Sequence, residues 1–382
     1  MAVVKLDSGY NIGVDPLSCT FFGHPADFPP KKSEVLQNTD LPHLSIVSTG
    51  GTIASRIDYR TGSVTSQFDA NDILVAIPEL AKVANYRTIP LATILSENMT
   101  PVIWQELARA VYKEIKNGVT GVIITHGTDT MAYSSAAISF MIDTPVPVIF
   151  VGSQRSADRP SSDNAMNAVC AASAATSDLG EVAVVMHATT NDDTCAIHRG
   201  TRVRKMHSSR RDAFRSMGID PIGSVAYPSR EVSLKSYAVR RGSQTLALHD
   251  KLQEHCGLVQ FYPGMSPDLL KAYEGYKGLV LAGTGLGHVS TTLLPSLKKL
   301  IKSGTIVLMT TQCMQGRVCD RVYDTGRDLL TAGVIEGGDM LPEVALVKMM
   351  WVLGNERDPE RAAALMQTDL KGECNRRSIH GL

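Results

Sequence analysis

Residues 44–52 read LSIVSTGGT, a short apolar strand that runs directly into a glycine turn. After it, helical and apolar-strand patterns alternate at 69–77, 101–117, 121–125, 130–142, 146–151, 162–177 and 182–187. Short apolar strands that alternate with helices are typical of a parallel sheet covered by helices on both faces. The sequence therefore predicts an α/β domain over residues 44–220.

The rest of the chain divides into four parts. Residues 1–22 suggest a β-hairpin around the turn Asp7-Ser8-Gly9, and residues 23–43 form a proline-rich linker. Residues 221–276 are irregular, with a hairpin-like stretch near 225–239, and are interpreted as a connecting segment. A second, smaller α/β domain is expected over 277–382, from strand and helix patterns at 278–282, 291–303, 305–310 and 342–353.

Composition narrows the class of protein. Of the 382 residues, 43% are hydrophobic and 20% are charged, which fits a folded chain rather than a disordered one. The formal net charge is +0, so the chain is not expected to bind nucleic acid mainly by itself. The N-terminal residues do not resemble a signal peptide, and no apolar run approaches the length of a membrane span. A cytoplasmic protein with free thiols and no membrane contact is predicted.

Polar residues follow several of the expected strands. Thr52 follows the first strand and Thr128-Asp129 follows the strand 121–125, while Lys205 lies further along in an arginine-rich run. Each has a structural explanation: a tight turn, a helix N-cap, and a solvated basic face, respectively. Together they match the needs of amide hydrolysis, because a threonine becomes a nucleophile only when a nearby base accepts its proton.

Two segments, STGGTIAS (48–55) and ITHGTDTMAYSS (124–135), are similar to the signature segments of the asparaginase/glutaminase family. The resemblance covers about residues 44–355 and implies an asparaginase-like α/β fold. It implies that Thr52 is the nucleophile and that Thr128, Asp129 and Lys205 complete the catalytic set.

The same resemblance implies the substrate-binding residues. Tyr59 matches the tyrosine of a mobile lid, and Ser96-Glu97 match the residues that hold the α-carboxylate and α-amino groups of the substrate. Glu97 departs from the simpler asparaginases, which often carry glutamine there. No metal site is implied, because the histidines show no ligand spacing and His126 suits packing or hydrogen bonding better. The segment 283–288 (GTGLGH) lacks a dinucleotide fingerprint and is expected to be a close-packed turn.

Four stretches resemble one branch of the family, the D-type component of archaeal-type glutamyl-tRNA(Gln) amidotransferases: 55–65, 151–168, 257–270 and 315–330. Residues 3–16 resemble the last strands of that branch's N-terminal barrel, so most of the barrel is expected to be missing. The branch implies a glutaminase that supplies ammonia to a partner, the E-type amidotransferase component, which binds Glu-tRNA(Gln) and uses ATP and Mg. No cofactor is implied for this chain itself, which has no Walker A loop.

A homodimer through the C-terminal domain is also expected, with a heterotetramer as the whole assembly. Its motivation is the apolar stretch Val344–Val352, for which a packed core helix is the equal alternative. Two other functions stay open: a free-standing cytoplasmic L-asparaginase, and a non-enzymatic module for assembly or tRNA docking. The complete set of Thr52, Thr128, Asp129 and Lys205 argues against the non-enzymatic module.

Overall fold

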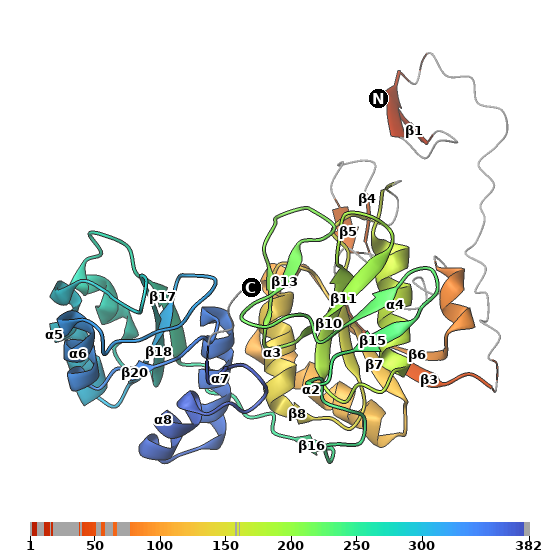
Figure 1. Ribbon diagram of the computed structural model, residues 1–382. Coiled ribbons are helices and arrows are strands. Elements are labelled where there is room, and N and C mark those ends of the chain that lie inside the picture. The colour runs from red at the N-terminus through yellow and green to blue at the C-terminus, as the bar shows by residue number, and fades with distance from the viewer. Residues whose placement is uncertain are drawn as a thin grey trace.

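The computed structural model of the chain describes residues 2–5, 11–15, 17, 38, 40–50, 55–57, 64–66, 77–156, 159 and 161–377. Within these ranges a larger domain is built around an eight-stranded sheet and a smaller domain around a four-stranded sheet (Figure 1). The predicted N-terminal hairpin is confirmed, because β1 (Ala2–Lys5) pairs antiparallel with β2 (Asn11–Val14).

The larger sheet is mixed, with the spatial strand order β15-β14-β11-β10-β9-β7-β3-β6. Its strands are β3 (His43–Gly50), β6 (Asn85–Ile94), β7 (Gly121–Thr125), β9 (Val148–Val151), β10 (Val182–His187), β11 (Thr194–Arg199), β14 (Gly223–Ala226) and β15 (Val232–Leu234). The run from β10 to β6 is parallel, as the sequence predicted, and β11, β14 and β15 continue the sheet antiparallel. The carboxyl ends of the five parallel strands therefore meet at one edge of the sheet.

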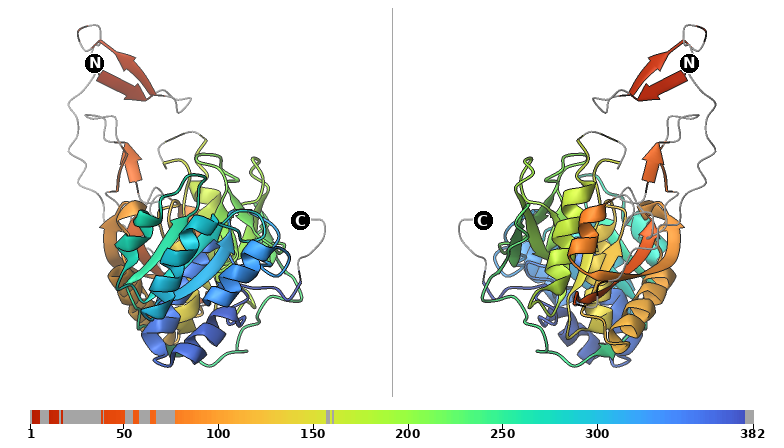
Figure 2. Two further views of the ribbon diagram at one scale, coloured as in Figure 1. Left: turned by 90° about the vertical axis from the view of Figure 1, so that its left-hand side faces the viewer. Right: turned by 90° about the vertical axis from the view of Figure 1, so that its right-hand side faces the viewer.

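Helices cover both faces of this sheet. One face packs against α2 (Pro101–Lys116) and α3 (Met131–Met141), and the other against α4 (Asn164–Thr176) and the short helix η3 (Pro78–Lys82) (Figure 2). The predicted start of α2 is confirmed, because the Thr100 hydroxyl accepts a hydrogen bond from the Ile103 amide at 3.3 Å. Helix α4 is rich in alanine and almost wholly buried, which allows it to lie close to the strands.

Strand β6 was not predicted from the sequence, and the reason is local. It contains Pro90, and its side chains are mostly half-buried rather than alternating between buried and exposed. Proline lacks an amide donor, but it is tolerated in an edge strand, where one side of the backbone needs no partner. Because β6 is the outermost strand beside β3, Pro90 fits there. The helix expected at 69–77 falls almost entirely outside the described residues.

The smaller domain contains a parallel sheet with the order β17-β18-β19-β20. Its elements are β17 (Cys256–Gln260), η5 (Pro267–Tyr273), β18 (Gly278–Gly283), η6 (Thr291–Leu293), α5 (Leu294–Lys302), β19 (Ile306–Thr311), α6 (Asp324–Ala332), β20 (Ile335–Glu336), α7 (Pro342–Asn355) and α8 (Pro359–Gln367). The segment after β18 is the expected turn, because Thr284 and His288 bridge each other. The left-hand view of Figure 2 shows this domain lying against one side of the larger one.

The segment 221–276 contributes to both domains. Strands β14 and β15 complete the larger sheet, and β17 is the first strand of the smaller sheet. Between them, β16 (Ala247–Leu248) pairs with β8 (Ile142–Asp143). These strands are short and only partly apolar, so their sequence pattern is weaker than that of the parallel strands.

Helix α7 joins the two domains. Its side chains Val344, Val347 and Met349 are fully buried, and it packs against α3 of the larger domain as well as β17 and β18 of the smaller one. The apolar stretch Val344–Val352 is thus covered within the chain itself, as a core helix, and it gives no support to the homodimer expected from it. Among the described helices, none combines the length and apolar character that crossing a membrane requires.

Candidate active site

The predicted site residues that the structure describes gather at the carboxyl edge of the larger sheet. Thr128 and Asp129 follow the end of β7, and Ser96 follows the end of β6 in the short helix η4 (Ser96–Asn98). This is the edge at which open α/β sheets bind their ligands. Thr128 and Ser96 are buried, whereas the Asp129 side chain is 68% exposed and faces solvent.

Lys205 reaches this edge from a β-hairpin. It ends β12 (Val203–Lys205), which pairs antiparallel with β13 (Phe214–Ser216), and Phe214 opposite it is fully buried. Its Nζ donates to Thr128 Oγ1 at 2.9 Å and to Asp129 Oδ1 at 2.7 Å. A hydroxyl and an amine within hydrogen-bond distance form the pair that proton transfer to or from a nucleophile requires.

Thr52 and Tyr59 lie outside the described residues, so their predicted roles stay predictions. The strand that leads to Thr52 is described as far as Gly50. Ser48 of that strand is in register with Thr125 of β7, and Thr49 Oγ1 donates to the Thr125 carbonyl at 3.0 Å. The strand that leads to Thr52 therefore ends beside the strand that leads to Thr128.

Ser96 and Glu97 differ in their surroundings. Glu97 is exposed, while Ser96 is buried and its carbonyl accepts a hydrogen bond from Thr130 Oγ1 at 2.8 Å. Gly127 lies so close that a Cβ at that position would be 2.6 Å from Ser96 Cβ. The predicted substrate-binding serine and the loop with Thr128 are thus packed against each other.

Gly127→Ala is expected to destabilise the protein by about 1–3 kcal/mol, because the added methyl group overlaps Ser96. Urea denaturation measures this loss. The double variant Gly127→Ala/Ser96→Gly removes the opposing Cβ and is expected to recover most of the stability. A Gly127→Ala protein as stable as wild type would contradict the close packing of these two loops.

His126 is a buried packing residue. Its Nδ1 lies 2.6 Å from the Gly127 carbonyl oxygen, and its ring centroid is 5.8 Å from that of Phe150. Burial lowers the pKa of His126 to about 4, so the ring is neutral near pH 7. These contacts confirm the expectation of a packed, hydrogen-bonded histidine.

The arginine-rich run around Lys205 is not the solvated face that its sequence suggests. Each arginine is paired with a carboxylate: Arg199 with Glu181, Arg202 with Asp339, Arg204 with Glu343, Arg210 and Arg215 with Asp212, and Arg211 with Asp192. Because Asp339 and Glu343 belong to the C-terminal domain, Arg202 and Arg204 hold the two domains together. The sequence could not reveal these partners, since most are far away along the chain.

A carboxylate that sequence analysis missed orders the loop after β9. Asp163 is fully buried and accepts hydrogen bonds from the Ser153 hydroxyl, from the amides of Gln154 and Arg155, and from the Asn167 side chain. The only signal in the sequence is the stretch 151–168, which resembles the D-type branch as a whole. Asp163 therefore supports the carboxyl edge of the sheet without belonging to the predicted catalytic set.

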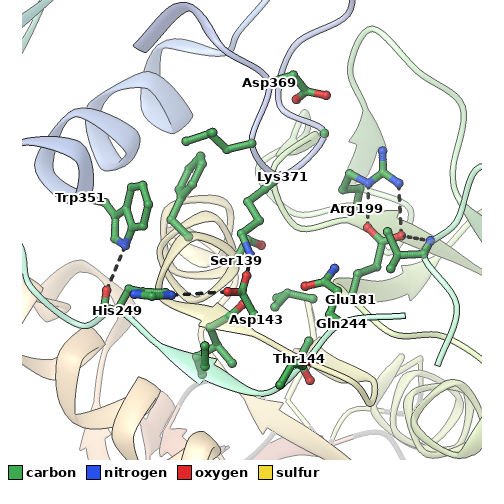
Figure 3. Close-up of a pocket in the computed structure, with 18 of the residues that line it drawn as sticks. Ser139, Asp143, Thr144, Glu181, Arg199, Gln244, His249, Trp351, Asp369 and Lys371 are labelled. Atoms are coloured by element: carbon green, nitrogen blue, oxygen red, sulfur yellow. Dashed lines mark hydrogen bonds and ion pairs between the residues drawn. The ribbon is translucent and has the colours of Figure 1, made fainter. Parts of the chain in front are cut away.

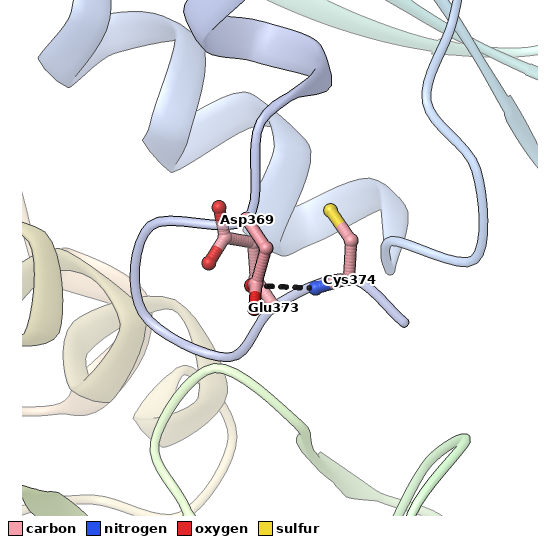
Figure 4. Close-up of side chains that lie close together, drawn as sticks. All are labelled: Asp369, Glu373 and Cys374. Atoms are coloured by element: carbon pink, nitrogen blue, oxygen red, sulfur yellow. Dashed lines mark hydrogen bonds between the residues drawn. The ribbon is translucent and has the colours of Figure 1, made fainter. Parts of the chain in front are cut away.

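Two further clusters lie away from Lys205. A cavity of about 920 Å³ opens between the domains at the amino end of β10, and its charged walls are already paired, Arg199 with Glu181 and Lys371 with Asp143 (Figure 3). Asp369, Glu373 and Cys374 lie within metal-binding distance of one another (Figure 4). However, Glu373 is paired with Lys348, and burial raises the pKa of the Cys374 thiol to about 12, so this thiol keeps its proton.

Comparisons with known proteins agree with this arrangement. The family model "Asparaginase, N-terminal" matches residues 43–239, and "Glutaminase/Asparaginase C-terminal domain" matches residues 255–366. The chain is 54% identical to the D-type component of the glutamyl-tRNA(Gln) amidotransferase of Methanosarcina mazei, over 97% of this chain and 92% of that protein. It is also 54% identical to the D-type component from Archaeoglobus fulgidus, over 97% of this chain and 88% of that protein.

Solved structures give the same result for the fold. The thermostable L-asparaginase from Thermococcus kodakarensis superposes with a TM-score of 0.77 at 34% identity, covering 88% of this chain and 100% of that one. L-asparaginase I from Vibrio cholerae gives a TM-score of 0.75 at 28% identity, covering 88% of this chain and 99% of that one.

Proposed function

The chain belongs to the asparaginase/glutaminase family, and from this we propose that it is the glutaminase component of a glutamyl-tRNA(Gln) amidotransferase. The observation that carries the proposal is the 54% identity to proteins named as the D-type component, over nearly the full length of both chains. The substrate is glutamine, and the product passed on is ammonia.

The chemistry proceeds in two steps. Thr52 Oγ attacks the side-chain amide carbon of glutamine while its proton passes to the neutral amine of Lys205, and the amide nitrogen leaves as ammonia after taking up a proton. Water then hydrolyses the acyl-threonine to release glutamate and restore Thr52. The 2.9 Å contact between Lys205 and Thr128 supports this assignment, because it holds an amine and a hydroxyl together at the site. Tyr59, Ser96 and Glu97 bind the substrate.

Ammonia release is useful only when an acceptor is ready. The partner, the E-type amidotransferase component, binds Glu-tRNA(Gln) and activates it with ATP and Mg, and ammonia converts it to Gln-tRNA(Gln). Two copies of this chain and two of the partner form a heterotetramer in the cytoplasm. The absence of a free basic face in the described part of the arginine-rich run supports tRNA binding through the partner rather than through this run.

A free-standing L-asparaginase is the second candidate. It is favoured by the superposition on the asparaginase from Thermococcus kodakarensis, which extends over the whole of that chain. The two functions share one catalytic set, so only substrate preference and dependence on a partner separate them.

Ammonia release from glutamine is expected to be low for the chain alone and to rise with the E-type partner and Glu-tRNA(Gln). An increase of roughly tenfold or more corresponds to an ordinary coupling free energy of about 1–3 kcal/mol between two sites. Steady-state ammonia release is measured with each component added in turn, and uncharged tRNA is the control. Equal turnover in all conditions, with asparagine preferred over glutamine, would leave the free-standing asparaginase.

A further inference from the structure

We infer that Asp192 is a positioning residue that holds Lys205 against Thr128. The inference rests on the proposed function, because it assigns Lys205 to the reaction. Asp192 lies in the loop after β10 and touches neither Lys205 nor Thr128 in any described contact, so its influence passes through other side chains.

The first link joins Asp192 to the hairpin that carries Lys205. Arg211 lies in the loop between β12 and β13, and its Nη1 donates to Asp192 Oδ1 at 2.6 Å. Its Nη2 also donates to the Thr190 carbonyl in the same loop as Asp192. Arg211 is only 17% exposed, so this ion pair is partly shielded from water and contributes more than an ordinary surface pair. The hairpin is thereby fastened to the edge of the sheet.

The second link joins Asp192 to the interior of the sheet. Asp192 Oδ1 lies 3.2 Å from His187 Nε2, and His187 Nδ1 lies 2.6 Å from Asn167 Oδ1. The orientation of the Asn167 amide is fixed, because its Nδ2 donates to the Gly152 carbonyl at 3.0 Å and to Asp163 at 2.9 Å. The oxygen of Asn167 must then face His187, whose Nδ1 carries the hydrogen.

The third link returns to the catalytic set. Gly152 lies so close to the loop after β7 that a Cβ at that position would be 2.9 Å from Thr128 Cγ2. A continuous series of contacts therefore runs from Arg211 through Asp192, His187, Asn167 and Gly152 to Thr128, and the Lys205–Thr128 hydrogen bond closes it. Asp192 is where the hairpin side of this ring meets the buried side.

Asp212 provides a contrast within the same hairpin. It accepts hydrogen bonds from Arg210 and Arg215, and both arginines belong to the hairpin. This pair stiffens the loop internally but does not tie it to the sheet. Arg210→Met is therefore a matched control for Arg211→Met, because the substitution and the hairpin are the same and only the contact with Asp192 differs.

The test measures kcat and KM for ammonia release from glutamine, with the E-type partner and Glu-tRNA(Gln) present. Asp192→Asn and Arg211→Met are each expected to lower kcat about tenfold to a hundredfold, the range for loss of a charged hydrogen bond, with KM nearly unchanged. The double variant is expected to fall no further than the less active single variant, because both remove one contact. Arg210→Met is expected to retain wild-type kcat, and Arg211→Lys to regain part of it.

Several results would overturn the inference: kcat within twofold of wild type for both single variants, effects that multiply in the double variant, or a loss confined to KM. Thermal unfolding checks that each variant is folded, and if Asp192→Asn is not, Arg211→Met and Arg211→Lys decide. Failure of the proposed function looks different, because wild-type protein would then show no glutamine-dependent ammonia release that rises with partner and charged tRNA.

Discussion

Thr52→Ala is expected to abolish ammonia release while the protein remains folded. Removing an activated nucleophile costs about three to six decades in kcat, whereas loss of a hydroxyl that only binds substrate acts mainly on KM. Thr52→Ser keeps a hydroxyl and is expected to retain measurable turnover. The measurement is single-turnover ammonia release from glutamine, with thermal unfolding recorded on the same samples.

The outcome that would remove Thr52 from its role is clear. A Thr52→Ala protein with more than about a tenth of wild-type kcat has lost no nucleophile, because that change is about 1.4 kcal/mol in activation free energy. In that case Thr128, which contacts Lys205, becomes the candidate nucleophile, and Thr128→Ala tests it in the same assay.

Lys348→Met is expected to cause the largest loss of stability, about 3–5 kcal/mol, because it leaves a buried carboxylate without its partner. Lys348 and Glu373 form an ion pair in which both side chains are 0% exposed. Burial by itself would raise the pKa of Glu373, but Lys348 and the neighbouring backbone amides lower it further than burial raises it. The free energy of unfolding, from urea or guanidinium denaturation, measures the loss.

Two controls separate this effect from a general intolerance of methionine. Lys271→Met changes an exposed lysine paired with Asp268 at 2.8 Å and is expected to alter stability by less than about 0.5 kcal/mol. Lys348→Met/Glu373→Gln removes both charges and is expected to recover much of the loss. If Lys348→Met were as stable as Lys271→Met, the pair would not be buried as described.

Strongly patterned elements followed from the sequence alone. The apolar strand 121–125 and the helix after Thr100-Pro101 are both confirmed with nearly the predicted bounds. Strand β6 was missed because Pro90 disguises it, and β14 and β15 because they are short and polar. Local pattern reports burial, and it fails where a strand lies at an edge of the sheet.

The candidate site divides in the same way. Thr128 and Asp129 were found because they directly follow a recognisable strand, while Lys205 needed the family resemblance, since nothing local separates it from the arginines around it. The partners of those arginines, and the contact between Arg211 and Asp192, depend on which loops meet in the folded chain. Such contacts join residues that no sequence period connects, so pattern alone cannot predict them.

The last described residues fasten the two domains to each other. The Thr201 hydroxyl and the Arg202 guanidinium donate to the carbonyls of Lys371 and Gly372, and the Asn375 amide donates to the Gly218 carbonyl. A ribosome makes these residues after everything they contact, and domains generally begin to fold in the order of synthesis. The larger domain therefore waits, during translation, for a strap that arrives at the end, and the final shape of this enzyme is set only as its synthesis finishes.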